Sequence, residues 1–194
     1  MTFVLLAVAY LLGAVPFAYL LVRLTTGSDI RQSGSGNVGA TNALRANRLA
    51  GVLTLLCDAG KGSLAVWLAQ RYGGESWLPV AAGIAAIVGH MFPVFLRFRG
   101  GKGVATGCGA FVMLAPWAVA AVFAIFVFVV MLSRFISLGS VASAAAFPFC
   151  ALLLGYGSPV VWGCVLGSVL IIAKHRSNIR RILRGEESRF RLRS

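Results

Sequence analysis

Three short polar segments interrupt an otherwise apolar chain of 194 residues. They are residues 33–42 together with Arg45, residues 97–103, and residues 175–181. Glycine lets several backbone N–H groups approach one anion, and lysine or arginine supplies the opposing charge. Polar residues are costly in a lipid-embedded chain unless they have a task. We therefore interpret all three segments as candidate phosphate-binding sites.

The first segment mixes glycines with hydroxyl and amide side chains, and Arg45 follows where the next apolar run begins. It is too polar for a membrane span and too rich in glycine for a helix, so we expect a structured loop. An asparagine side chain can donate to a phosphate and accept from a hydroxyl. An ordinary flexible connection is the alternative. The candidate site residues here are Gly34, Ser35, Gly36, Asn37, Thr41, Asn42 and Arg45.

The second segment contains Gly-Gly-Lys-Gly at positions 100–103 and resembles a phosphate loop. It is not a Walker A sequence, because Leu96 replaces the first glycine and Val104 replaces the Ser or Thr that would hold Mg²⁺. No nucleotide is therefore implied, and a flexible basic turn is the alternative. Thr106 and the start of the next helix can add N–H groups and a helix dipole to the same anion site. The candidate residues here are Gly100, Gly101, Lys102, Gly103 and Thr106.

The third segment lies at the expected end of the last apolar helix. His175 and Asn178 are three residues apart and share a helix face, and Arg176 and Arg180 share a neighbouring one. An interfacial histidine is the alternative, but an asparagine and arginines beside it favour a functional group.

A fourth polar group lies inside the apolar runs. Asp58 and Lys61 form an i, i+3 pair in the second span, where ionisable residues are costly unless they are paired or face a polar cavity. They are either a structural ion pair or a polar wall of the site in which one member orients a motif residue. His90 is either a structural hydrogen bonder in support of the site or a residue in direct contact with substrate.

The composition identifies the class of protein. Hydrophobic residues make up 59% of the chain and charged residues 12%, which is typical of an integral membrane protein. A hydrocarbon core of roughly 30 Å needs about 20 helical residues. We expect an all-α polytopic bundle in one domain, residues 1–194, with about seven transmembrane helices. The runs are 2–22, about 49–68, 79–96, 104–115, 116–133, about 138–155 and 159–173. If the two runs around Pro116 do not span separately, we expect five.

The distribution of Lys and Arg predicts the orientation. These residues fall in alternate loops, whereas the opposite loops carry only Arg71. We therefore expect the N-terminus outside and the C-terminus and all three polar segments on the cytoplasmic side. The formal charge of +13 is interpreted as this bias and as attraction to anionic membrane lipids, with no nucleic acid as partner. The four cysteines have no metal-binding spacing, so we expect no metal.

Taken together, the segments resemble the bacterial acyl-phosphate glycerol-3-phosphate acyltransferase family, often called PlsY. The resemblance rests on residues 34–42 with Arg45, on Gly89-His90 through Pro93 leading to 98–106, and on 175–181 running to Gly185 and Glu187. The order, the spacing and the total length agree across essentially the whole chain. An arginine-rich tail after Glu187 is the one departure, and only the role of the tail is affected by it.

The resemblance implies transfer of a fatty acyl group from acyl phosphate to the 1-hydroxyl of sn-glycerol 3-phosphate. The products would be 1-acyl-glycerol 3-phosphate and phosphate, at the first step of bacterial phospholipid synthesis in the cytoplasmic (inner) membrane. It implies no cofactor, and a peripheral enzyme that makes acyl phosphate is a possible partner.

The site roles are carried over motif by motif from the resemblance. Lys102 and its glycines would hold a phosphate, and Arg45 and Ser35 would complete the charged pocket. Asn178 and Asn37 would orient glycerol 3-phosphate, and His175 is either the base for the hydroxyl or a hydrogen bonder that positions it. Arg176 and Glu187 are further candidate substrate-binding residues.

A small transporter of phosphorylated organic anions is the alternative function. It would share the basic loops and the many spans. Transporters usually place their sites near the bilayer midplane on broken helices in repeated halves, whereas here the polar segments gather at one surface.

Overall fold

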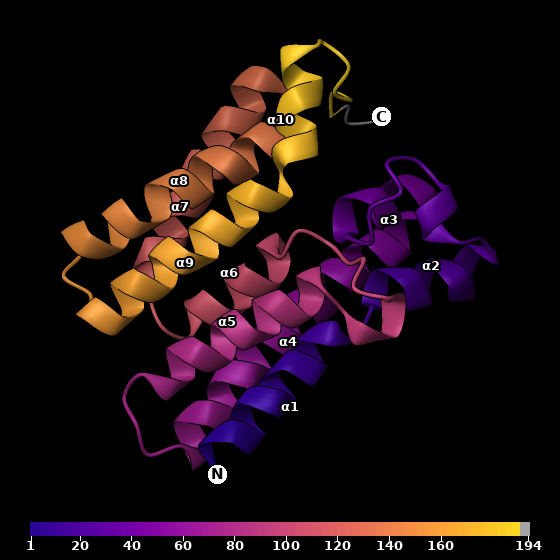
Figure 1. Cartoon of the computed structure of the whole chain (residues 1–194). Coiled ribbons are helices and arrows are strands. Elements are labelled where there is room, and N and C mark those ends of the chain that lie inside the picture. The colour runs from indigo at the N-terminus through magenta and orange to yellow at the C-terminus, as the bar shows by residue number, and fades with distance from the viewer. Residues whose placement is uncertain (191–194) are drawn as a thin grey trace. The chain divides into compact units, whose positions relative to one another are not determined.

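The computed structural model describes residues 1–190, and this part of the chain consists of helices and loops without β-strands. The chain divides into two compact units, Met1–Leu114 and Ala115–Ser194 (Figure 1). The expected all-α helical bundle is therefore confirmed. The expectation of a single domain stays a prediction.

The first unit places its longer helices side by side and its polar loops at one end. Helices α1, α4, α5 and α6 pack against one another, and α2 and α3 lie at the end opposite the N-terminus (Figure 1). The helices are α1 (Thr2–Ala14), α2 (Phe17–Thr26), α3 (Ala40–Ala46), α4 (Arg48–Tyr72), α5 (Leu78–Met91) and α6 (Val104–Val112). Two short 3₁₀ turns, η1 (Ile30–Gln32) and η2 (Val94–Leu96), lie in the loops.

Glycines bring the helices of the first unit into close contact. A Cβ at Gly13 would collide with the backbone of α5, and one at Gly89 with the backbone of α1. A Cβ at Gly62 would collide with α6, and one at Gly109 with α4. Small residues at helix interfaces are the usual way for membrane helices to approach closely. This packing holds the ends of α4, α5 and α6, where polar residues of the first unit lie.

Pro16 divides the first apolar run into two helices. Proline has no N–H group and cannot continue the hydrogen-bonding pattern of a helix. Helix α1 ends at Ala14, and α2 begins at Phe17. The backbone between them is left outside the helices, and its carbonyl groups can accept bonds from other side chains.

The second unit, as far as residue 190, is built from four helices joined by short loops: α7 (Pro116–Ser133), α8 (Ile136–Leu153), α9 (Ser158–Lys174) and α10 (Arg176–Leu183). Helix α8 packs against both α7 and α9. Helices α9 and α10 meet at an angle of 53° at His175.

Five helical segments of the described chain are long and apolar enough to cross a membrane, and the number rises to six if α9 and α10 count as one span. The five segments are Thr2–Thr26, Arg48–Tyr72, Leu78–Leu96, Pro116–Ser133 and Ile136–Leu153. The larger count of seven is not reached, because α6 has nine residues and rises about 14 Å, roughly half of the hydrocarbon core. Ser158–Lys174 qualifies only together with α10. The orientation of the chain stays a prediction.

Candidate active site

Asn42 organises the first polar loop. Its side-chain NH₂ donates to the carbonyls of Ile30, Ser33 and Asn37 at 3.2, 2.9 and 3.1 Å. Its Oδ1 accepts from the backbone N–H of Ser35 at 3.1 Å. Asn42 is buried, with 3% of its surface exposed. The amide is thus committed to the loop itself, and we interpret Asn42 as a residue that shapes the loop.

Two glycines let the loop turn around this amide. Gly34 and Gly36 have φ angles of 56° and 67°, a region that favours glycine. A Cβ at Gly34 would also collide with Asn42 Oδ1. Ser35 between them and Thr41 beyond them are exposed, and Asn37 is half-buried. The prediction of a structured loop agrees with residues 33–39, but it is wrong for residues 40–42, which begin helix α3.

A cavity of about 290 Å³ opens beside the loop. Arg45 from α3 lines it, and the lining also includes Thr26, Ser28 and Ser33. An exposed guanidinium beside three hydroxyl-bearing residues matches an anion that carries several oxygen atoms. Of the predicted site residues, Gly34, Asn42 and Arg45 share this cavity.

The second polar loop is fixed to the end of α5. The N–H of Gly100 donates to the carbonyl of Met91 at 3.2 Å, and the N–H of Gly101 donates to the carbonyl of His90 at 3.1 Å. These two N–H groups therefore hold the loop rather than face an anion. Lys102 follows, half-buried, and Gly103 caps α6 with a φ of 79°.

The first turn of α6 offers a second feature for an anion. The leading N–H groups of a helix have no partner within it and carry partial positive charge. Thr106 lies in this turn with its side chain fully buried, and its Oγ1 has no hydrogen-bond partner among the described residues. Lys102, Gly103 and Thr106 are thus placed together at one helix end, as the sequence predicted from their spacing.

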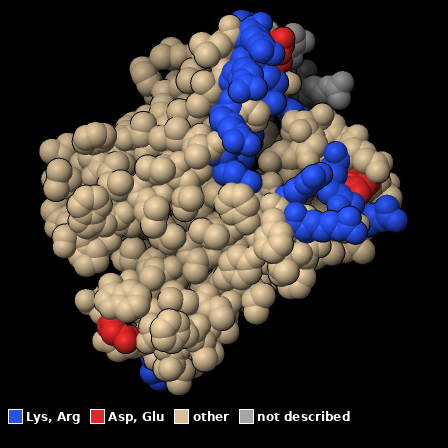
Figure 2. All heavy atoms as spheres, viewed as in Figure 1, with Lys and Arg blue, Asp and Glu red and all other residues tan. Residues whose placement is uncertain are grey.

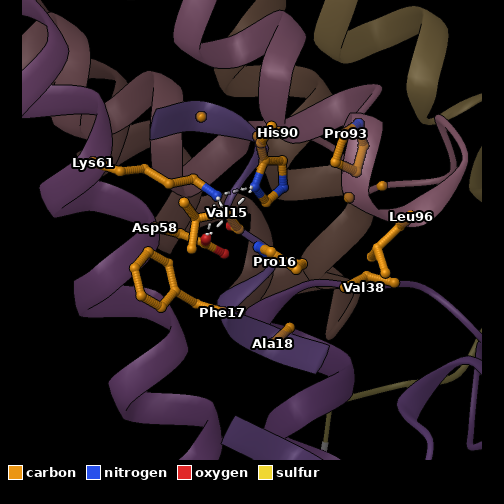
Figure 3. A pocket seen from close by; sticks show the side chains of 14 residues that line it. Val15, Pro16, Phe17, Ala18, Val38, Asp58, Lys61, His90, Pro93 and Leu96 are labelled. Carbon is orange, nitrogen blue, oxygen red and sulfur yellow. Dashed lines mark hydrogen bonds and ion pairs between the residues drawn. The ribbon is translucent and has the colours of Figure 1, made fainter. Parts of the chain in front are cut away.

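Figure 3 shows a buried polar cluster formed by Asp58, Lys61 and His90, and His90 lies against Gly101 of this loop. Lys61 Nζ is 2.8 Å from Asp58 Oδ1 and 3.0 Å from His90 Nδ1. It also donates to the carbonyl of Val15 at 3.0 Å. Asp58 and His90 are themselves 3.5 Å apart. The structure therefore joins the three residues that the sequence predicted as supporting groups, and it adds a backbone carbonyl that the sequence analysis missed.

In the second unit, His175 lies at the junction of α9 and α10 and is 2% exposed. Its Nδ1 is 2.8 Å from the carbonyl oxygen of Ile171. Because a carbonyl can only accept, Nδ1 carries a proton, and Nε2 is the basic nitrogen of the neutral ring. The local fold thus fixes both the tautomer and the orientation of His175.

Glu187 holds Asn178 in place, about one helical turn beyond His175. Its Oε1 accepts from Asn178 Nδ2 at 2.6 Å and from Ser137 Oγ at 2.7 Å. Its Oε2 accepts from Arg181 Nε at 2.6 Å. Burial raises the pKa of Glu187, but the three hydrogen bonds outweigh it, so this pKa lies below the usual value. Glu187 is thereby a support for Asn178.

The amide oxygen of Asn178 is the unused group of this arrangement. Asn178 is 5% exposed, and its Oδ1 has no hydrogen-bond partner among the described residues. A buried acceptor without a partner costs free energy, so it points to a donor that arrives with a ligand. Arg176, at the start of α10, is exposed. The predicted shared helix face is wrong, because α9 ends at Lys174 and α10 begins at Arg176. His175 lies at the 53° bend between the two helices, and Asn178 lies in the first turn of α10.

Basic side chains gather near the polar segments of each unit. Figure 2 shows Lys and Arg gathered at the α2–α3 end of the first unit and along α10 of the second. In the first unit the exposed arginines of these segments are Arg23, Arg31, Arg45, Arg48, Arg97 and Arg99. Each unit thus presents positive charge where its polar loops lie.

Two groups of the site were not found from the sequence. Ser137 supports Glu187, but a single serine in an apolar run gives no signal of its own. The carbonyl of Val15 could have been found, because Pro16 marks a helix break that exposes carbonyl groups.

Comparison with known proteins identifies the family. The family model described as "Glycerol-3-phosphate acyltransferase" matches residues 3–185. The chain belongs to this family. Relatives with that name include a protein of Syntrophotalea carbinolica, 44% identical over 97% of each chain. One of Ralstonia nicotianae is 46% identical over 97% of this chain and 93% of its own.

Solved structures of the family share the fold. A crystal structure of PlsY (YgiH), an integral membrane glycerol 3-phosphate acyltransferase in its glycerol 3-phosphate form, matches with a TM-score of 0.92 at 37% identity. The match covers 98% of this chain and 96% of that one. The lysophosphatidic acid form matches with a TM-score of 0.90 at 35% identity, over 98% and 95% of the two chains. The protein is accordingly a multi-pass membrane protein of the PlsY type.

Proposed function

We propose that the protein transfers a fatty acyl group from acyl phosphate to the 1-hydroxyl of sn-glycerol 3-phosphate. The products are 1-acyl-glycerol 3-phosphate and inorganic phosphate. Membership of the acyltransferase family supports this function over the alternative of an anion transporter. The related PlsY structures are described as glycerol 3-phosphate and lysophosphatidic acid forms, which correspond to the acceptor and the product.

The unpartnered oxygen of Asn178 is the observation that carries the proposal. A hydroxyl is both a donor and an acceptor, so the acceptor substrate can donate its O–H to Asn178 Oδ1. Glu187 fixes the amide through the hydrogen bond from Nδ2, so the oxygen is presented in one orientation. Such a preorganised acceptor orients glycerol 3-phosphate through its other hydroxyl, which keeps its proton, while the proton of the 1-hydroxyl stays free for transfer.

The anionic groups of the substrates are assigned to the first unit. We assign one phosphate to Lys102 and the first turn of α6, and the second to Arg45 with the loop around Ser35. Asn37 and Thr41 complete these sites, and the glycines shape the loops that carry them, while Arg176 adds positive charge in the second unit. Each assignment rests on cations and N–H donors, which are the groups that stabilise phosphate.

The reaction needs no covalent intermediate. The 1-hydroxyl oxygen attacks the acyl carbon, the bond from that carbon to the phosphate oxygen breaks, and phosphate leaves with the bonding electrons. The hydroxyl proton goes to His175 Nε2, or it goes to a substrate phosphate while His175 only positions the hydroxyl. An acyl phosphate is a mixed anhydride with a good leaving group, so positioning and charge neutralisation supply much of the rate.

The location of the reaction follows from the proposed topology. The Lys and Arg asymmetry favours a site on the cytoplasmic side of the bacterial inner membrane. Water-soluble glycerol 3-phosphate would reach the polar loops from the cytoplasm, and a peripheral enzyme would deliver acyl phosphate at the same face. Membrane lipids surround the apolar helices and accept the product.

The direct test uses the purified full-length chain in detergent or lipid. It is incubated with palmitoyl phosphate and glycerol 3-phosphate, and lysophosphatidate and phosphate are measured. We expect the two products in equal amounts. Absence of lysophosphatidate from a folded sample would refute the proposed function.

A further inference from the structure

Lys61 lies among three acceptor atoms inside the first unit. Its ammonium group has three N–H donors, and Asp58 Oδ1, His90 Nδ1 and the Val15 carbonyl lie within 3.0 Å of it. The face of the Phe17 ring lies 5.7 Å away. The side chains of Lys61 and Asp58 are only 4% and 2% exposed. The cluster is therefore a fixed arrangement of groups from α2, α4, α5 and the break between α1 and α2.

This arrangement fixes the state of His90. Because the ammonium donates to Nδ1, that nitrogen is the acceptor of the ring and Nε2 carries the proton. The Nε2 edge faces Gly101, where a Cβ would collide with Nε2 itself and with the carbonyl of Val38. The carbonyl of His90 also accepts from the N–H of Gly101. Gly101 is thus held by the backbone of His90 and lies directly against its ring.

The contact joins the two polar loops of the first unit. Val38 belongs to the first loop and Gly101 to the second, and both line the same small space as Asp58, Lys61 and His90. That space has a volume of about 10 Å³, roughly enough for one water molecule. No substrate group fits there, so the three polar side chains act through the loops they support.

We propose that Asp58, Lys61 and His90 form a positioning device that sets the place of Lys102 in the substrate site. This rests on the proposed function, in which Lys102 binds a substrate phosphate. The ion pair holds the His90 ring, the ring sets the position of Gly101, and Gly101 is the residue that precedes Lys102. The cluster touches no substrate.

The energetic cost of the cluster favours such a role. A buried ion pair is often no more stable than apolar side chains of the same volume. Stability alone therefore gives little reason for three polar side chains among membrane helices. A fixed geometry does give one, because a shift of about 1 Å in a positioning group can cost as much as 10²-fold in rate.

His90→Asn separates positioning from folding. The Asn oxygen takes the place of Nδ1 and still accepts from Lys61, whereas nothing remains against Gly101. We expect His90→Asn to have near-normal thermal stability in detergent and to lose at least tenfold in kcat/KM. The loss should appear mainly as a higher KM, and for the same substrate whose KM rises in Lys102→Ala. His90→Gln, which places an amide near Nε2, is expected to recover part of this loss.

A double-mutant cycle tests the route through Lys102. If His90 acts through Lys102, His90→Asn lowers kcat/KM much less in a Lys102→Ala background than in the wild type. The fold-loss of kcat/KM in the double variant is then smaller, by at least about fivefold, than the product of the two single fold-losses. Ser63→Ala is the matched control, since Ser63 also lies on α4 and donates to the Gly109 carbonyl at 2.8 Å, away from the loop. Its effect should be equal in both backgrounds.

The same cycle with Asp58→Asn provides a second measurement if His90→Asn does not fold. Equal losses in both backgrounds, or a folded His90→Asn variant with normal KM and kcat, would overturn the proposal. Wild-type protein that makes no lysophosphatidate would instead refute the proposed function, so the two failures are distinguishable.

Discussion

Replacement of Glu187 by glutamine tests the support of Asn178. The carboxylate accepts three hydrogen bonds, and its side chain is 9% exposed. Glutamine has the same size, but it has one oxygen instead of two and turns an NH₂ group toward one of the donors. At least one of the charge-assisted hydrogen bonds is lost, and the side chain at position 187 no longer carries a charge. Asn178 is therefore held less firmly.

The expected size follows from these contacts. A hydrogen bond to a charged group contributes about 1.5–3 kcal/mol. Arg181 is 35% exposed, so solvent screens its pair with Glu187 and only part of that bond is counted. We expect Glu187→Gln to lower the free energy of unfolding by about 2 kcal/mol, a fall in Tm of about 4–8 °C for a chain of this length.

The assay compares thermal unfolding and turnover in detergent with those of Glu186→Gln. Glu186 is the exposed neighbour and undergoes the same chemical change, so we expect neither Tm nor kcat/KM to move in that control. The pKa of Glu187 in the folded protein lies below its ordinary value of 4.5, so its stabilisation is complete above that pH and is lost as the pH falls through the lower folded value. Glu187→Gln should remove this acid dependence. An unchanged Tm and unchanged turnover in Glu187→Gln would refute the reasoning.

Three further predictions concern the reaction and the topology. Lys102→Ala should mainly raise KM, and His175→Ala should mainly lower kcat. If His175 is the base, kcat of His175→Asn falls by about 10² to 10⁴-fold. A near-normal kcat in His175→Asn would instead indicate that a substrate phosphate accepts the proton. Acyl-CoA in place of acyl phosphate should not support turnover, and robust lysophosphatidate synthesis from acyl-CoA alone would contradict the donor. Cysteines introduced at Ser33 and Glu75 should differ in their labelling by an impermeant thiol reagent in intact cells, with only position 75 labelled. Labelling of position 33 from outside would refute the topology.

The fold could be predicted well from the sequence because apolar length is a strong signal. The runs beginning at residues 2, 49, 79, 116 and 138 each correspond to a helical segment that can span. The run at 104–115 could not be judged by composition, since a short apolar helix packed on α4 and α5 has the same residues as part of a span. The run 2–22 was predicted without a break, and the consequence of the break at Pro16 depends on Lys61, a residue 45 positions further along the chain.

The candidate site could be predicted at the level of segments but not of hydrogen bonds. Residue type and spacing indicate that Lys102 precedes a helix, but they wrongly place His175 and Asn178 on one helix, because the chain bends at His175. They do not indicate that the N–H groups of Gly100 and Gly101 are bonded to the end of α5. Such bonds depend on how α5 ends and turns back, which is a tertiary property.

The two buried asparagines show why partners decide the role of a residue. Asn42 and Asn178 are 3% and 5% exposed, and both lie next to basic residues in polar segments. Asn42 shares its NH₂ among three carbonyls and gives its oxygen to a backbone N–H, so both ends of the amide are used by the loop. Asn178 donates to Glu187, while its oxygen has no partner among the described residues. A buried acceptor of this kind is costly unless a ligand satisfies it, and this difference is the reason that we propose Asn178, and not Asn42, as an asparagine that meets a substrate hydroxyl.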